Sequence, residues 1–345
     1  MTPVQALLWP FSVAYGAGAR VRAWSYRVGI FHQKRLKGAV VSVGNLTVGG
    51  TGKTPMVAWL AKRFSEAGAR TAVLCRGYRP LPRRSEAGDD PRIAEGWNDE
   101  TALLHGRLGS DVELGANANR YEKGRELEDI GVECFVLDDG FQHLQLARDV
   151  DIVMVDATNP FGGGHVLPAG RLREPVSALR RADIIVITRS DHAPAVEAVV
   201  RRYSEAPIMY AQTELVGIEP YGADLNSPVE AAREGKKIFA FCGIGNPAAF
   251  LDDLKRWGLS VVGHAKFRDH YFYAEHDVAN LEAQAAAVSA DALVCTEKDI
   301  YDLMPLRTKR IPIHFCKISL RINEEERLWH AIVEMISRRK PGALR

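Results

Sequence analysis

Short apolar runs alternate with helical patterns along most of the chain. The runs have the length and composition of buried strands. They are Val40–Val43, Thr71–Cys75, Cys134–Leu137, Asp151–Val155, Ile184–Thr188, Lys237–Cys242, Leu259–Val262, Ala292–Thr296 and Ile311–Lys317. Apolar residues at helical spacing occur in Val57–Phe64, Ala248–Trp257 and Glu275–Val288. This alternation predicts an α/β fold in which helices cover both faces of a mainly parallel sheet.

A polar and charged stretch from Pro220 to Lys237 interrupts this pattern. We therefore expect a core domain over residues 38–220 and a smaller α/β domain over residues 221–345, preceded by a distinct N-terminal segment, residues 1–37. The chain has 345 residues, of which 46% are hydrophobic and 26% charged, so it can bury two such cores. The five cysteines form no CxxC pair, which argues for a reducing compartment and against a structural zinc site.

The first 37 residues differ in charge from the rest of the chain. Nine Lys or Arg and no Asp or Glu precede Glu66, although the net charge of the whole chain is only +2. The uncharged segment Met1–Ala19 contains Leu7, Leu8, Trp9, Phe11 and Tyr15. This combination is typical of an amphipathic helix on an anionic membrane surface. A helix packed on the protein's own body is the open alternative, whereas Pro10 and the absence of early charges disfavour a spanning helix or a secretory signal.

The segment VGNLTVGGTGKTP at residues 43–55 predicts a phosphate-binding loop, because it follows a strand and opens a helix. Its candidate phosphate-binding residues are Gly49, Gly50, Thr51, Gly52, Lys53 and Thr54. Lys53 is expected to reach the terminal phosphates and Thr54 to bind Mg²⁺. Thr47 replaces the first glycine of the usual pattern. We therefore predict that the chain binds a nucleoside triphosphate such as ATP.

Two consecutive carboxylates follow the strand-like run that ends at Leu137. Asp138 and Asp139 repel each other unless a cation lies nearby, so we expect them to hold Mg²⁺ beside the phosphate loop. His143 lies close enough in sequence to face the same cleft, although a structural imidazole is an equal alternative.

A loop rich in glycine and proline, residues 162–175, carries two arginines. Arg171 is the candidate for a phosphate contact. Arg173 and Glu174 fit equally well as a solvated ion pair.

Taken together, the motifs resemble those of the tetraacyldisaccharide 4'-kinases of lipid A biosynthesis, in the same order. Besides the phosphate loop they are CRGY (Cys75–Tyr78), NDE (Asn98–Glu100), LDDGFQH (Leu137–His143), LPAGRLREP (Leu167–Pro175), CGIGNPAAF (Cys242–Phe250), FRDHYFY (Phe267–Tyr273) and CTEKD (Cys295–Asp299). The resemblance implies a P-loop kinase on the cytoplasmic face of the inner membrane. It would phosphorylate the 4'-hydroxyl of an acylated glucosamine disaccharide 1-phosphate with ATP and Mg²⁺, without an obligate protein partner.

The resemblance also implies roles for individual residues. Asp99 is the base that accepts the proton of the sugar hydroxyl, and His270 is its partner from the second predicted domain. Lys53 and Arg171 stabilise the transferring phosphate. The residues alone leave open that Asp99 caps a helix and that His264 is the partner. Further candidates for binding the substrate are Arg76, Tyr78, Asn119, Arg120 and His143.

Two positions depart from the family pattern. Gly162-Gly163-Gly164 replaces a Gly-Asn-Gly, and Tyr271 replaces the second histidine after Asp269. An alternative function is that of a membrane-associated P-loop switch without a small-molecule acceptor. Binding to nucleic acid is disfavoured, because the N-terminal bases follow an apolar segment that suits lipid.

Overall fold

The chain folds into two compact units. The computed structural model describes residues 2–77, 98–221, 235–304 and 306–343. The larger unit comprises residues 1–78, 107–212 and 320–345, and the smaller unit comprises residues 79–106 and 213–319. The chain continues from one unit into the other within two long strands, β7 (Ile208–Pro220) and β11 (Ile313–Ile322).

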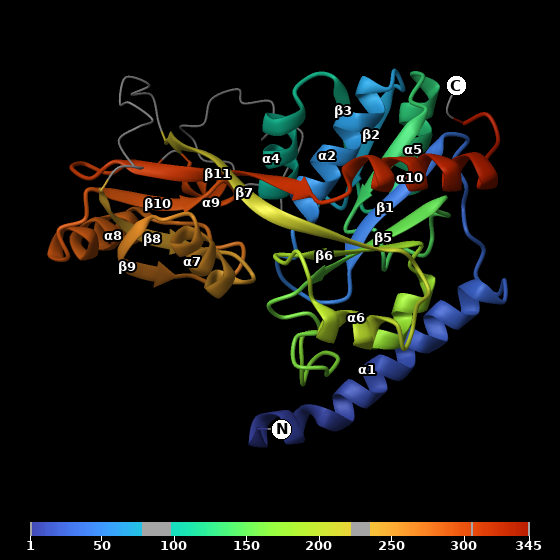
Figure 1. Ribbon diagram of the computed structural model, residues 1–345, viewed down its shortest axis with the longest axis horizontal. Coiled ribbons are helices and arrows are strands. Elements are labelled where there is room, and N and C mark those ends of the chain that lie inside the picture. Colours follow the sequence, from blue (N-terminus) through green and yellow to red (C-terminus); the bar gives the residue numbers. More distant parts are fainter. Residues whose placement is uncertain (1, 78–97, 222–234, 305, 344–345) are drawn as a thin grey trace. The chain divides into compact units, whose positions relative to one another are not determined.

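The larger unit contains a parallel sheet with the strand order β3-β2-β4-β1-β5-β6-β7 (Figure 1). Its other strands are β1 (Ala39–Asn45), β2 (Thr71–Cys75), β3 (Val112–Ala116), β4 (Cys134–Asp138), β5 (Val150–Asp156) and β6 (Ile184–Thr188). Each neighbouring pair is parallel. Every residue of β1 and β5 is buried, which explains the uninterrupted apolar runs in the sequence.

Helices surround this sheet and complete the hydrophobic core. They are α2 (Lys53–Glu66), α5 (Arg120–Asp129), the 3₁₀ helix η1 (Val176–Arg181), α6 (Pro194–Val200) and α10 (Glu325–Arg339). Leu127 of α5 packs with Val40, Leu74 and Leu137 on one side of the sheet. α2 buries Leu60 and Phe64 completely.

The register of the sheet positions the predicted nucleotide site. β1 and β4 are neighbours, and Val43 of β1 pairs with Asp138 at the end of β4. In a parallel sheet the loops that follow adjacent strands meet at the same edge. The loop after β1 and the aspartates after β4 therefore lie side by side.

The smaller unit has its own parallel pairings, in the order β11-β10-β8-β9. Its elements besides β11 are α4 (Asp99–Leu108), β8 (Lys237–Cys242), α7 (Pro247–Arg256), β9 (Ser260–Lys266), α8 (Glu275–Ala287), β10 (Ala292–Thr296) and α9 (Asp299–Leu303). Leu103 of α4 joins a core cluster with Phe241 and Tyr273. This packing attaches the start of α4 to the smaller unit.

The N-terminal segment forms one long helix, α1 (Pro3–Arg27), along the outside of the larger unit (Figure 1). The helix continues through Pro10. Packing beyond Pro10 compensates: the Ser12 hydroxyl accepts a hydrogen bond from the amide of Ala169 at 2.8 Å, and Gly16 lies against Val166. Among the described helices, none has an apolar stretch long enough to cross a bilayer.

The predicted α/β class is confirmed, and each of the nine predicted strands overlaps an observed one. Two strands, β3 and β7, were not predicted. Glu113 and Gly115 interrupt the apolar pattern in β3, and β7 alternates buried residues with partly exposed ones. Neither strand therefore appears as a continuous apolar run.

Candidate active site

The loop between β1 and α2 has the form of a phosphate cradle. The N-terminus of α2 leaves backbone N–H groups without partners in the helix, and these groups bind anions well. Gly49 and Gly52 have φ angles of 115° and 82°, which residues other than glycine rarely adopt. The buried hydroxyl of Thr51 makes no hydrogen bond within the part of the chain that the structure describes. A phosphate group would satisfy these donors.

Lys53 connects the phosphate loop to Asp139, which directly follows β4. Its ammonium lies 3.2 Å from the amide oxygen of Asn45 and 3.5 Å from a carboxylate oxygen of Asp139. The other oxygen of Asp139 accepts a hydrogen bond from Arg173 at 2.5 Å. Burial raises the pKa of Asp139, but Lys53 and Arg173 outweigh this effect and hold the pKa well below its usual range. Asp139 is therefore ionised at neutral pH.

Three oxygen-bearing side chains at this edge suit a hard divalent cation. Asp138 is the buried last residue of β4, Asp139 follows it, and Thr54 lies in the first turn of α2. Carboxylate and hydroxyl oxygens are the ligands that Mg²⁺ prefers in proteins. The chemistry of this set therefore fits Mg²⁺, whose remaining ligands would come from phosphates and water.

The two arginines of the glycine-rich loop have different partners in the structure. Arg171 donates to the backbone oxygen of Val48 at 2.9 Å and thus braces the phosphate loop. The interpretation of Arg173 and Glu174 as a solvated ion pair was wrong. Arg173 pairs with Asp139, whereas Glu174 is buried and pairs with Arg181 at 2.7 Å. Arg173 was missed as a site residue because its partner is 34 residues away in the sequence.

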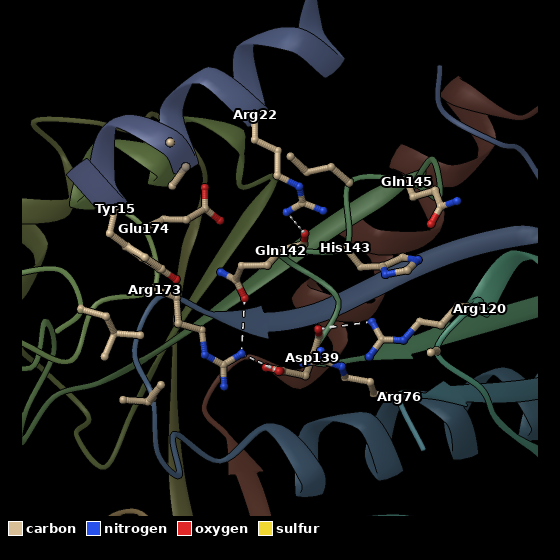
Figure 2. Close-up of a pocket in the computed structure, with 16 residues that line it drawn as sticks. Tyr15, Arg22, Arg76, Arg120, Asp139, Gln142, His143, Gln145, Arg173 and Glu174 are labelled. Carbon is tan, nitrogen blue, oxygen red and sulfur yellow. Dashed lines mark hydrogen bonds and ion pairs between the residues drawn. The ribbon is translucent and has the colours of Figure 1, made fainter. Parts of the chain in front are cut away.

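A cavity of about 800 Å³ extends from Asp139 to α1. Figure 2 shows Asp139 between Arg173 and Arg120, while Arg22 points down from α1 toward Gln142. The charged and polar side chains around it are Tyr15, Arg22, Arg76, Arg120, Asp139, Gln142, His143, Gln145, Arg173 and Glu174. The arginines outnumber the two carboxylates, so the cavity favours an anionic ligand.

Arg76, Arg120 and His143, three of the predicted substrate-binding residues, line this cavity. Arg120 is buried and donates to the backbone oxygen of Asp139 at 3.3 Å. Burial and the nearby charges of Arg120 and Arg148 lower the pKa of His143 to about 4. His143 is therefore neutral at pH 7, and its buried Nε2 has no hydrogen-bond partner among the described residues.

Asn119, another predicted substrate-binding residue, does not line this cavity. The side chain of Asn119 caps α5, accepting a hydrogen bond from the amide of Glu122 at 3.4 Å. Tyr78 lies outside the described residues.

Asp99 and His270 form a close pair in the smaller unit. An oxygen of Asp99 lies 2.9 Å from Nδ1 of His270, and Asp99 is only 3% exposed. Both residues belong to the same unit, so the pair forms without bringing the two units together. The interpretation of Asp99 as the helix cap was wrong, because the side chain of Asn98 accepts the capping hydrogen bond from the amide of Thr101. His264 is exposed on β9 and is not the partner.

Lys298 completes this cluster. Its ammonium lies 3.3 Å from Asp99, 3.3 Å from Glu100 and 3.4 Å from Nε2 of His270. Burial raises the pKa of Asp99, but the hydrogen bond with His270 and the charge of Lys298 outweigh burial and lower it. The hydrogen bond with Asp99 raises the pKa of His270, against burial and the charge of Lys298. Asp99 therefore remains a carboxylate, with the imidazole of His270 and the ammonium of Lys298 beside it.

A second buried carboxylate holds the histidine in place. Asp299 accepts hydrogen bonds from the amide of Gly243 at 2.7 Å and the hydroxyl of Tyr273 at 2.8 Å. The backbone oxygen of Gly243 in turn accepts a hydrogen bond from the amide of His270, whose φ is 55°. Lys298 and Asp299 both lie in the CTEKD motif, so charged residues directly after a buried strand were the signal that could have identified them.

Comparison with known proteins identifies relatives over almost the whole chain. Residues 4–337 match the model of the tetraacyldisaccharide-1-P 4'-kinase family. The tetraacyldisaccharide 4'-kinase of Geobacter metallireducens is 37% identical, and the alignment covers 96% of this chain and 98% of that protein. The corresponding protein of Geobacter sulfurreducens is 39% identical over 89% of this chain and 86% of its own length.

The fold is also similar to that of a solved structure. The crystal structure of LpxK from Aquifex aeolicus in complex with ATP superposes with a TM-score of 0.70 at 28% sequence identity. The similarity covers 96% of this chain and 99% of that one.

Proposed function

Because the chain belongs to the tetraacyldisaccharide-1-P 4'-kinase family, we propose that it transfers the γ-phosphate of ATP to the 4'-hydroxyl of a tetraacylated glucosamine disaccharide 1-phosphate. The product is a bis-phosphorylated lipid A precursor. The observation that carries this proposal is the link from the phosphate loop through Lys53 to Asp139, at the edge of a cavity that favours an anionic ligand and reaches α1.

In this proposal the larger unit binds the nucleotide. The loop amides and Lys53 hold the phosphates, and Thr54 with Asp138 and Asp139 hold Mg²⁺. Mg²⁺ supplies charge neutralisation on the phosphates when it is bound. Lys53 and Arg173 are the ionic partners of the Asp139 carboxylate in the structure. We propose that Mg²⁺ and the phosphates replace some of these ion pairs when the nucleotide binds.

Asp99 is proposed to accept the proton of the 4'-hydroxyl. Its lowered pKa makes it a weak base, but phosphoryl transfer has a loose transition state that needs little proton removal before the bond to phosphorus forms. His270 and Lys298 hold the carboxylate in one orientation. Arg76, Arg120 and the neutral His143 are proposed to bind the sugar and its phosphate in the cavity of the larger unit.

The decisive experiment follows the label from γ-³²P-ATP in the presence of Mg²⁺ and a detergent-dispersed tetraacyldisaccharide 1-phosphate. We expect label in the lipid fraction, and its position at the 4'-oxygen is checked by mass spectrometry. An acceptor whose 4'-hydroxyl is replaced by hydrogen is the control and should remain unlabelled. Release of the label only as inorganic phosphate would instead support the P-loop switch and contradict the kinase.

We also propose that α1 attaches the protein to the anionic cytoplasmic face of the inner membrane. Leu7 and Phe11 are 74% and 65% exposed and lie one helical turn apart. Exposed apolar side chains on one face, with arginines toward the end of the helix, suit the boundary between acyl chains and headgroups. This placement brings the enzyme to a substrate whose four acyl chains keep it in the membrane.

A paired substitution tests this attachment. Leu7→Glu/Phe11→Glu is expected to weaken vesicle partitioning by roughly 100-fold or more, because each buried apolar side chain contributes about 1.5–3 kcal/mol. The control variant is Ile130→Glu/Val216→Glu, which adds the same charge at two exposed apolar positions, one at the end of α5 and one in β7. It should partition like the unmodified protein. Vesicle co-sedimentation measures both. Equal partitioning of the two variants would leave α1 as a helix that only packs on the protein.

A further inference from the structure

A second cavity, of about 650 Å³, lies along the C-terminal half of α1. It does not contain the phosphate loop or Asp139. α1 contributes Arg20, Trp24 and Arg27 to it, and the 3₁₀ helix η1 contributes residues of its own. Six arginines line this cavity: Arg20, Arg27, Arg35, Arg148, Arg180 and Arg181. This concentration of positive charge is not used by the proposed reaction.

Among the described residues, carboxylates neutralise two of these six arginines. Arg148 pairs with Asp151 at 2.8 Å, and Arg181 pairs with Glu174 at 2.7 Å. Asp151 and Glu174 are also the only carboxylates among the residues that line the cavity as the structure describes it. The remaining four arginines have no carboxylate within 4.0 Å in the described part of the chain. Four like charges around one cavity repel one another, and an anion relieves this repulsion.

The surroundings of the cavity indicate what kind of anion it binds. Trp24 is 48% exposed, and the exposed Phe31 packs on Tyr26 with ring centroids 5.4 Å apart. Val28 and Ile30 are exposed beside them. Tryptophan and tyrosine concentrate at the level of lipid headgroups, with apolar residues on the acyl side. The unpaired arginines therefore lie beside an apolar and aromatic surface, as an anionic lipid requires.

We propose that this cavity is a binding site for the phosphate headgroup of an anionic membrane phospholipid, distinct from the cavity for the phosphorylated substrate. Arg20, Arg27, Arg35 and Arg180 contact the phosphate, and the acyl chains run along Val28, Ile30 and Phe31. The inference rests on the proposed attachment of α1 to a membrane. Because Arg22 and Tyr15 of the same helix line the first cavity, the bound lipid also secures one wall of the catalytic site.

Two substitutions remove half of the unpaired charge. Arg27→Gln/Arg180→Gln is compared with the unmodified protein on phosphatidylcholine vesicles with and without phosphatidylglycerol. We expect the variant to lose about 30-fold in affinity for the anionic vesicles, because each base near an anionic surface contributes about 1 kcal/mol. Its affinity for the neutral vesicles should not change. Arg27→Lys/Arg180→Lys retains the charge and should restore most of the binding, and thermal melting checks the fold of each variant.

A matched control separates this site from general attraction between opposite charges. Lys62→Gln/Arg202→Gln removes the same charge from exposed positions that do not line the cavity and should bind like the unmodified protein. An equal loss in this control would overturn the proposal. Failure of the unmodified protein to bind any vesicle would overturn the membrane attachment itself, whereas normal binding by Arg27→Gln/Arg180→Gln would overturn only the phosphate site.

The substrate's own 1-phosphate is the other source of the same chemistry. In neutral detergent micelles without phospholipid, we expect Arg27→Gln/Arg180→Gln to retain the KM and kcat of the unmodified enzyme. A several-fold rise in KM under these conditions would assign the cavity to the substrate and contradict a separate lipid site. Displacement of anionic vesicles by millimolar inorganic phosphate would likewise contradict it, since a lipid site depends on acyl contacts as well as charge.

Discussion

Replacement of Asp99 by asparagine is expected to lower kcat by about 10²- to 10⁴-fold, the range over which positioned general bases act. Asparagine has nearly the same shape but cannot accept the proton of a sugar hydroxyl. The fold should survive, because Lys298 keeps Glu100 at 3.3 Å and Asp269 at 3.8 Å as partners. Initial rates with labelled ATP and the acylated disaccharide measure the effect.

Several controls distinguish loss of the base from general damage around Asp99. Affinity for ATP, measured by calorimetry, should be unchanged, because the predicted nucleotide groups belong to the other unit. Asp111→Asn, at an exposed position after α4, should retain full activity. His270→Gln should cost less than Asp99→Asn, since the carboxylate remains. Near-normal turnover of Asp99→Asn would remove this residue from the chemistry.

The Asp99–His270 pair also has a spectroscopic signature. The hydrogen bond with Asp99 is the main cause that raises the pKa of His270, while burial and Lys298 lower it. In Asp99→Asn the imidazole should therefore titrate at a lower pH than in the unmodified protein, as followed by NMR of its ring protons. A titration that does not move would mean that the two side chains do not interact in solution.

Replacement of Lys53 by methionine should lower kcat/KM by roughly 10²- to 10³-fold or more, as expected when a charge that stabilises the transferring phosphate is removed. Methionine retains an unbranched apolar stem, and α2 keeps its buried face of Met56, Leu60 and Phe64. Asp139 keeps its ion pair with Arg173 at 2.5 Å, so the protein should remain folded. Steady-state kinetics at saturating lipid measure the change.

Lys62→Met is the matched control for this substitution. It lies on the same helix, its side chain is 72% exposed, and its carboxylate neighbour, Glu66, is 3.8 Å away on the surface. Its kinetics should equal those of the unmodified enzyme. If Lys53→Met also retained full kcat/KM, the loop after β1 would not be the site of phosphate transfer.

Much of the architecture could be predicted because it depends on neighbours in the sequence. Buried parallel strands need apolar residues at every position, so β1 and β5 stand out as runs. The phosphate loop needs glycines at positive φ before a helix, and glycines at these positions can be read directly from the sequence. The closeness of this loop to Asp138 and Asp139 also followed, because each follows a strand of a parallel sheet.

Pairing between side chains could not be predicted in the same way. Arg171 and Arg173 are two residues apart in one irregular loop, and nothing local distinguishes the arginine that braces Val48 from the one that contacts Asp139. Edge-like strands such as β3 were missed, since partial exposure removes the apolar pattern. In both cases the deciding contacts come from distant segments.

The α/β class, the phosphate loop and the carboxylates beside it can be predicted from the sequence alone, because the local geometry of a loop and the burial of strands constrain which residues follow one another. The residues alone left open whether Asp99 caps a helix or pairs with His264 or His270, and the packing of the fold places it beside His270, 171 residues later, and Lys298. The packing also brings into one cavity beside α1 four arginines, from three segments, that have no carboxylate partner among the described residues. Such contacts depend on how whole elements pack, which no local pattern encodes.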